Sequence, residues 1–232
     1  MANQNLAVAC RTVSPALLSV FKAKNTLELI LEVIMTAQSF PNKTIFVVAG
    51  PAGSGKSTVA NYVSEQSAIP YLEGDDFHTP ANIAKMHSGI PLTDVDRWDW
   101  LITLRNAATE QLKKSNAVIV TCSSSRRKYR DVFRLVPYYD HAVQLCFIYL
   151  KVGEEYLQAR VKARTGHYMK ENMVRSQLED LEEPAGEEVD AITFDVERNP
   201  ATICRDVLVR ARTILQTGHD SNSGLRHACL SE

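Results

Sequence analysis

Short runs of apolar residues alternate along the chain with longer segments in which apolar positions recur at helical spacing. Runs rich in β-branched or aromatic residues predict strands at 44–50, 117–125, 142–150 and 191–196, and a shorter one opens the segment 69–80. Helical spacing predicts helices within 55–68, 81–92, 93–116, 126–136 and 199–216. Because strands and helices alternate about five times, the order predicts an α/β fold. Its sheet is expected to be five-stranded and mostly parallel, with helices on both faces.

The two ends of the chain fall outside this alternation. Residues 1–42 are predicted to form a helical extension in which Ser14 is the N-cap and Pro15 the first helical residue. Three basic residues and no acidic one occur before residue 28, a bias shared with mitochondrial transit peptides, so mitochondrial import is the minor alternative to a cytoplasmic protein. Residues 217–232 are predicted to be a disordered tail. A single domain over 43–216 remains.

Composition and charge narrow the possible partners. The chain has 232 residues, of which 23% are charged, and its formal net charge is -1. Basic residues are interleaved with acidic ones, so no basic stripe attracts a nucleic acid. Charged residues break the longest apolar run near the N-terminus well short of a membrane span, so no membrane association is expected. Five scattered cysteines without a CxxC pair predict reduced residues of a cytoplasmic protein.

The segment 50–57 has the spacing of a phosphate-binding loop (P-loop), and it follows a predicted strand and opens a predicted helix. Backbone N–H groups and the positive end of the helix can therefore surround phosphate oxygens. Lys56 is expected to reach the β and γ phosphates of ATP, and the Ser57 hydroxyl is expected to ligate Mg²⁺. The predicted nucleotide-binding residues of this loop are Gly50, Pro51, Ala52, Gly53, Ser54, Gly55, Lys56 and Ser57.

The positions of the acidic residues favour one kind of P-loop protein. Strand 117–122 runs into Cys122 and Ser123 instead of a magnesium-binding aspartate, and no guanine-reading NKxD stretch occurs. Asp75 and Asp76 follow the second strand, whose carboxyl end faces the same crevice as the loop. A kinase of small molecules or nucleotides fits this arrangement, because an acid must orient the acceptor hydroxyl in line with the γ-phosphate.

Two basic clusters and a histidine also follow strand ends. Arg97 lies among acids and tryptophans, while Arg126 and Arg130 belong to a basic run after strand 117–125. Taken alone, each basic cluster is equally compatible with the solvated start of a helix, and His78 is compatible with an ordinary turn residue. Their common place on the nucleotide side of the sheet favours substrate or charge binding.

The charged segment 153–184 is predicted to be a helical lid. Arg160 and Arg164 lie one helical turn apart, next to Gly166. An ordinary surface helix with glutamate partners is the alternative. The neighbouring glycine hinge favours a lid whose two arginines close over the phosphates of the nucleotide and expel water.

Several motifs taken together resemble the gluconokinase family. The stretch "GDDFHTPANIAKMHSGIPLTDVDRWDWL" is similar to the family pattern GDxxHxxxNxxKMxxGxPLxDxDRxxWL. "CSSSRRKYRD" is similar to CSALKxxYRD, "RVKARTGHYM" to the lid pattern RLxxRxGHF, and "SQLEDLEEP" to SQFxxLExP. The resemblance covers about residues 43–216. It implies a three-layer P-loop kinase fold like that of adenylate and shikimate kinases, with a helical lid.

The resemblance also implies an activity: ATP-dependent phosphorylation of D-gluconate at its 6-hydroxyl, with Mg²⁺. The product, 6-phospho-D-gluconate, feeds the pentose phosphate pathway, and family members are commonly homodimers. Asp75 is expected to orient the acceptor hydroxyl, and Lys56 and Arg130 to take part in catalysis. Ser57 and Asp75 are the expected metal ligands. The expected substrate-binding residues are Asp75, His78, Asn82, Lys85, Arg97, Arg126 and Arg130.

Some residues depart from the family pattern. Ser124, Ser125 and Arg126 stand where the family usually has Ala-Leu-Lys, and Glu73 stands where it usually has aspartate. An arginine fork does not replace a lysine point charge, so any role tied to that lysine is in doubt. Two alternatives therefore remain: a kinase of another sugar acid or small polyol, and a regulatory protein that binds nucleotide without turnover.

Overall fold

The structure is a computed structural model that describes residues 43–157, 178 and 180–217. All of them fall within one compact unit, 40–232. The predicted N-terminal extension, most of the predicted lid with Arg160 and Arg164, and the tail beyond Thr217 lie outside the described residues. Predictions for those segments therefore remain predictions.

The described residues form a sheet of five strands, and helices connect most of them. The strands are β1 (Lys43–Ala49), β2 (Tyr71–Leu72), β3 (Ala117–Cys122), β4 (Val143–Lys151) and β5 (Ala191–Asp195). The helices are α4 (Lys56–Ser67), the short 3₁₀ helix η2 (Gly74–Phe77), α5 (Pro80–His87), α6 (Asp94–Gln111), α7 (Arg127–Tyr139) and α10 (Pro200–Thr217). These elements match the predicted alternation of strands and helices.

All strand pairs are parallel, in the order β2-β3-β1-β4-β5, which confirms the predicted α/β sheet. Val47 in the central strand β1 stands in register with Val120 of β3 on one side and Phe147 of β4 on the other. The chain leaves β1 toward β2 and β3, and later crosses to the opposite side for β4. The loop after β1 therefore lies at the point where the strand order reverses, the usual ligand site of such sheets.

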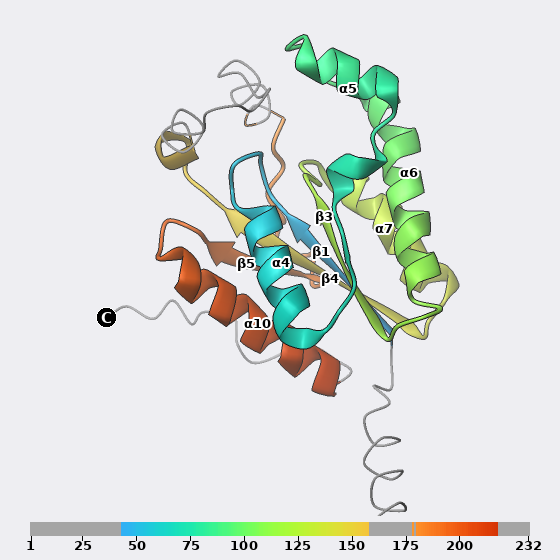
Figure 1. Cartoon of the computed structure of the whole chain (residues 1–232), viewed down its shortest axis with the longest axis vertical. Coiled ribbons are helices and arrows are strands. Elements are labelled where there is room, and N and C mark those ends of the chain that lie inside the picture. The colour runs from blue at the N-terminus through green and yellow to red at the C-terminus, as the bar shows by residue number, and fades with distance from the viewer. Residues whose placement is uncertain (1–42, 158–177, 179, 218–232) are drawn as a thin grey trace, which may run out of the picture. The chain divides into compact units, whose positions relative to one another are not determined.

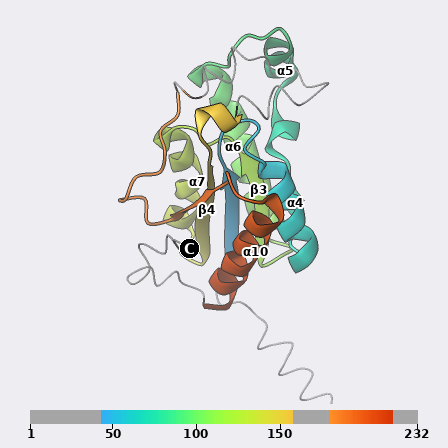
Figure 2. The same ribbon diagram turned by 90° about the vertical axis from the view of Figure 1, so that its left-hand side faces the viewer.

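Two hydrophobic layers cover the sheet, one on each face. Phe46 and Val48 of β1 pack with α4 and α10, whereas Ile45 and Val47 pack with α6 and α7. Figures 1 and 2 show these helix pairs on opposite sides of the strands. The alternation follows from the period of two along a strand, so a strand apolar at every position is buried on both faces.

Local sequence signals set the helix ends near the site. Thr93 and Asp96 form a capping box at the start of α6, and Thr79 caps α5, whose first residue is Pro80. Helix α7 continues through Pro137 to Tyr139, three residues beyond the predicted end. Among the described residues, no helix combines the length and apolar character needed to cross a lipid bilayer. The three described cysteines are free and buried, as expected for reduced core residues.

Candidate active site

The loop between β1 and α4 is shaped to receive an anion. Gly50, Gly53 and Gly55 all have positive φ angles. Gly55 is the N-cap of α4 in the left-handed conformation, and no side chain caps the first amides of the helix. Those amides and the helix dipole are therefore oriented toward a phosphate site. Lys56 Nζ donates to the carbonyl oxygen of Pro51 at 3.0 Å, which holds the ammonium group at the loop.

A cluster that the sequence does not reveal joins β2 and β3 beside this loop. The Glu73 carboxylate accepts hydrogen bonds from Tyr71 Oη and Thr121 Oγ1, and Thr121 Oγ1 accepts from the Gly74 amide at 3.0 Å. Burial alone would raise the pKa of Glu73, but hydrogen bonds from Thr121, Tyr71 and Ser57 lower it. An ionised carboxylate is thus held beside the Ser57 hydroxyl. The sequence marks Glu73 as a departure from the aspartate usual in the family, but it does not reveal that Tyr71 and Thr121 bind its carboxylate.

Asp75 and His78 lie together at the η2 turn. The Asp75 side chain is 70% exposed, and its Oδ1 is 4.0 Å from Nε2 of the buried His78. The His78 ring stacks on Trp100 with centroids 4.2 Å apart, and Trp100 Nε1 donates to the Gly74 carbonyl at 2.7 Å. Burial, together with the charge of Arg97, lowers the pKa of His78 to about 4. The imidazole is therefore neutral at pH 7 and can exchange hydrogen bonds with a polyol.

Asp75 and Lys56 both lie near the carboxyl end of β3. Burial raises the pKa of the Cys122 thiol, the last residue of β3, to about 11, and the charges of Lys56 and Asp75 both act on it. The predicted phosphate-binding cation and the predicted acceptor-side carboxylate therefore both lie in the neighbourhood of this strand end. Their roles at the two substrates remain predictions.

Asn82 and Lys85, both predicted to bind substrate, hold α5 against α6. Asn82 is buried, and its Nδ2 donates to the Asp96 carbonyl oxygen at 2.7 Å. Lys85 Nζ lies 2.5 Å from the Asp96 carboxylate. Hydrogen bonds from Lys85 and then Thr93 lower the pKa of Asp96 to about 2. These contacts hold α5 to the start of α6, and direct contact of either side chain with substrate remains a prediction.

Arg97 lies on α6 beside this pair. Its guanidinium carbon is 5.6 Å from the centroid of the Tyr129 ring, and its Nε donates to the Leu92 carbonyl at 3.4 Å. Within the described part of the chain, no carboxylate pairs with Arg97.

Arg126 and Arg130 both pair with acidic residues of the protein. Arg126 pairs with Asp180 and lies 3.6 Å from Asp94. Arg130 is fully buried and makes four hydrogen bonds: two to the Glu188 carboxylate, at 2.7 and 2.6 Å, one to the Ser124 carbonyl and one to the Glu182 carbonyl. In this structure both arginines anchor the segment 180–188 to the start of α7. Their predicted roles at the substrate stay predictions.

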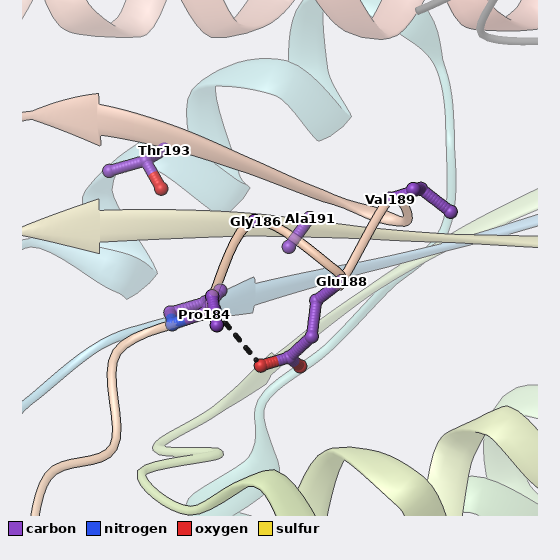
Figure 3. Close-up of a pocket in the computed structure, with 7 residues that line it drawn as sticks. Pro184, Gly186, Glu188, Val189, Ala191 and Thr193 are labelled. Carbon is purple, nitrogen blue, oxygen red and sulfur yellow. Dashed lines mark hydrogen bonds between the residues drawn. The ribbon is translucent and has the colours of Figure 1, made fainter.

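Glu188 belongs to a loop that follows the edge of the sheet. Figure 3 shows its carboxylate on the inner side of this loop, where it accepts a hydrogen bond from the Ala185 amide at 3.2 Å. A shallow cavity of about 210 Å³ separates the loop from β5, and its lining includes Pro184, Val189 and Thr193. None of the predicted site residues lines it, so this cavity is separate from the candidate active site.

The described fold and site define a class of protein. A phosphate-binding loop at the switch point of a parallel sheet, with an exposed carboxylate at the end of a second strand, is the arrangement of P-loop kinases. Residues 45–185 match the family model AAA_33, an AAA domain.

Comparisons with known proteins identify the family within this class. The chain is 48% identical over 159 residues to the "Probable gluconokinase" of Schizosaccharomyces pombe, which covers 68% of this chain and 82% of that protein. It is 39% identical over 154 residues to the "Thermoresistant gluconokinase" of Escherichia coli, covering 66% and 85%. A crystal structure of a gluconokinase from Sinorhizobium meliloti superposes with a TM-score of 0.62 at 37% identity, covering 78% of this chain and 99% of that one. The chain belongs to the gluconokinase family.

Proposed function

We propose that this protein transfers the γ-phosphoryl group of ATP to the 6-hydroxyl of D-gluconate. The observation that carries the proposal is the 48% identity over 159 residues to a relative named as a gluconokinase. The geometry supports the proposal, because Lys56 of the loop and Asp75 of the η2 turn both act on Cys122 at the carboxyl end of β3.

The residues of the chain divide the chemistry between them. The amides of the loop and Lys56 hold the ATP phosphates, and Asp75 accepts a hydrogen bond from the 6-hydroxyl. The hydroxyl oxygen forms a bond to the γ-phosphorus while the bond from that phosphorus to the β–γ bridging oxygen breaks, and ADP leaves. The hydroxyl proton passes to Asp75 and then to solvent, for which the 70% exposure of this side chain leaves a path.

Mg²⁺ fits this site through oxygen donors. Among the described residues, no group of three or more His, Cys, Asp or Glu side chains could form an all-protein cage. That suits an ion that binds mainly through nucleotide phosphates and water. The Ser57 hydroxyl, which hydrogen-bonds Glu73, and the Asp75 carboxylate would hold the ion. When bound, it offsets the charge of the phosphates.

Replacing Glu73 with glutamine is expected to weaken ATP binding in the presence of Mg²⁺ by about tenfold, as loss of an outer-shell carboxylate typically does. ATP binding in EDTA should stay unchanged, because only the metal-dependent part is affected. Calorimetric titration under both conditions measures the two dissociation constants. Glu110→Gln, which removes an exposed carboxylate paired with Lys113, is the matched control. An equal loss with and without Mg²⁺ would instead assign Glu73 to the shape of the loop.

We also infer the remaining partners and the setting of the reaction. The substrate is a small molecule, and the net charge of -1 supports the absence of a nucleic-acid partner. Membership of the family supports a homodimer in the cytoplasm. Analytical ultracentrifugation and subcellular fractionation of the full chain test these two inferences.

Release of ADP from MgATP by the purified full chain tests the function. D-gluconate should give a selective increase over shikimate, epimers of gluconate, related polyols and a blank without acceptor. A selective increase with another acceptor would keep the kinase and replace its substrate. Binding of ATP without any acceptor-dependent increase would favour the regulatory protein.

A further inference from the structure

The cations predicted to bind the substrate differ in their charge partners. Lys85 pairs with Asp96, Arg126 with Asp94 and Asp180, and Arg130 with Glu188. Arg97 is the member of this set that has no carboxylate partner within the described residues. A carboxylate that enters the site would therefore compete with a protein acid at each of the other three positions, but not at Arg97.

The surroundings of Arg97 orient its guanidinium group. Tyr129 presents its ring face at 5.6 Å, and the Leu92 carbonyl accepts from Nε at 3.4 Å. The two terminal nitrogens have no hydrogen-bond partner among the described residues. This outer edge is the fork that binds the two oxygens of a carboxylate in parallel.

His78 connects Asp75 to the helix that carries Arg97. Asp75 Oδ1 lies 4.0 Å from His78 Nε2, and the His78 ring stacks on Trp100, which lies about one turn after Arg97 on α6. The charge of Arg97 also acts on His78, so Asp75 and Arg97 both lie in the neighbourhood of this histidine. In an extended aldonic acid, the hydroxyl that is phosphorylated and the carboxylate occupy opposite ends of the carbon chain.

We propose that Arg97 binds the carboxylate of the acceptor and thereby makes the site selective for a sugar acid over a neutral polyol. The proposal rests on the proposed function, because it requires an acceptor whose far end carries the charge. His78, which lies beside Asp75 and stacks on Trp100 of α6, contributes hydrogen bonds to the hydroxyl groups in the middle of the carbon chain.

An experiment with a charged and a neutral acceptor separates this role from a structural one. D-gluconamide keeps the hydroxyl groups of D-gluconate but replaces its carboxylate with a neutral amide of similar shape. We would measure kcat/KM for both acceptors with the wild-type chain, Arg97→Gln and Arg105→Gln. Arg105 lies two turns further along α6, where it hydrogen-bonds Asn106, and serves as the matched control.

The wild-type chain should prefer D-gluconate to D-gluconamide by about a hundredfold, which corresponds to an interaction between charged groups. In Arg97→Gln, kcat/KM for D-gluconate should fall by about the same factor, while that for D-gluconamide stays within about threefold of wild type. Arg105→Gln should keep the wild-type preference.

Equal losses for both acceptors in Arg97→Gln would overturn the proposal and assign Arg97 to packing against Tyr129. An unchanged preference for the acid would overturn it as well. Failure of the proposed function is detected separately, as the absence of D-gluconate phosphorylation by the wild-type chain. If another sugar acid proves to be the substrate, the same comparison is made with its amide, and if no acceptor is phosphorylated the proposal falls with the function.

Discussion

Replacing Asp75 with asparagine is expected to lower kcat for D-gluconate by about a thousandfold, within the range that a positioned general base contributes. Asparagine keeps the size of the side chain, but it cannot accept the proton of the 6-hydroxyl and offers only one acceptor oxygen. The Asp75 side chain is 70% exposed, so the change should leave the stability of the fold nearly unaffected. The loss therefore reports on the chemistry of the site.

Asp76→Asn supplies the matched control, because Asp76 is the next residue of the η2 turn and is also exposed. Single-turnover release of ADP, with ATP binding measured separately, distinguishes the chemical step from nucleotide affinity. ATP affinity measured in EDTA, without Mg²⁺, should change by no more than about twofold in either variant, because both keep the loop and Lys56 intact. Similar losses of kcat in the two variants would show that the charge of the turn matters, and would remove Asp75 from its role.

Local patterns in the sequence were sufficient to predict the phosphate-binding loop and the elements on either side of it. The apolar run before Gly50 and the glycines of the loop lie within fifteen residues, so strand, turn and helix can be read together. The same holds for the Thr79-Pro80 helix start and the capping box of Thr93. Burial on both faces made the parallel sheet predictable as well.

The partners of polar side chains could not be read in this way, because they are distant in sequence. Glu73 bonds Thr121, which lies 48 residues further on, and Arg130 pairs with Glu188 at a separation of 58 residues. A basic run after a strand predicts a charged edge, but it does not say whether an acid from elsewhere in the fold neutralises it. Arg97 and Arg130 look equivalent as motif residues. Only the fold shows that Arg130 pairs with Glu188, whereas Arg97 has no carboxylate partner among the residues that the structure describes.

Replacing Arg130 with methionine is expected to destabilise the fold by about 3 to 5 kcal/mol, the usual cost of removing one partner of a buried ion pair. The side chains of Arg130 and Glu188 are 1% and 2% exposed. Methionine fills similar space but leaves the Ser124 and Glu182 carbonyl oxygens without the hydrogen bonds that Arg130 donates. Urea denaturation of the wild type and the variant measures the difference.

An exposed ion pair provides the comparison. Arg198 and Asp206 lie 2.9 Å apart, with side chains 53% and 41% exposed, so Arg198→Met should cost less than about 1 kcal/mol. If Arg130→Met cost no more than this control, the buried pair would contribute little and Arg130 would be available for the substrate. A large loss of stability without a fall in kcat would instead exclude a direct catalytic role.

The fall of the free energy of unfolding at acidic pH provides a second measurement of the Arg130–Glu188 pair. Burial alone would raise the pKa of Glu188, but hydrogen bonds from Arg130 and Arg134 lower it to about 2, against 4.5 in the unfolded chain. Since the folded pKa is the lower one, the stabilisation is complete above pH 4.5 and is lost as the pH falls toward 2. Arg130→Met should bring the folded and unfolded pKa values of Glu188 closer together. The free energy of unfolding should then depend less on pH between 4.5 and 2. An unchanged pH dependence in the variant would mean that Arg134, 2.5 Å from the same carboxylate, is sufficient to keep Glu188 ionised.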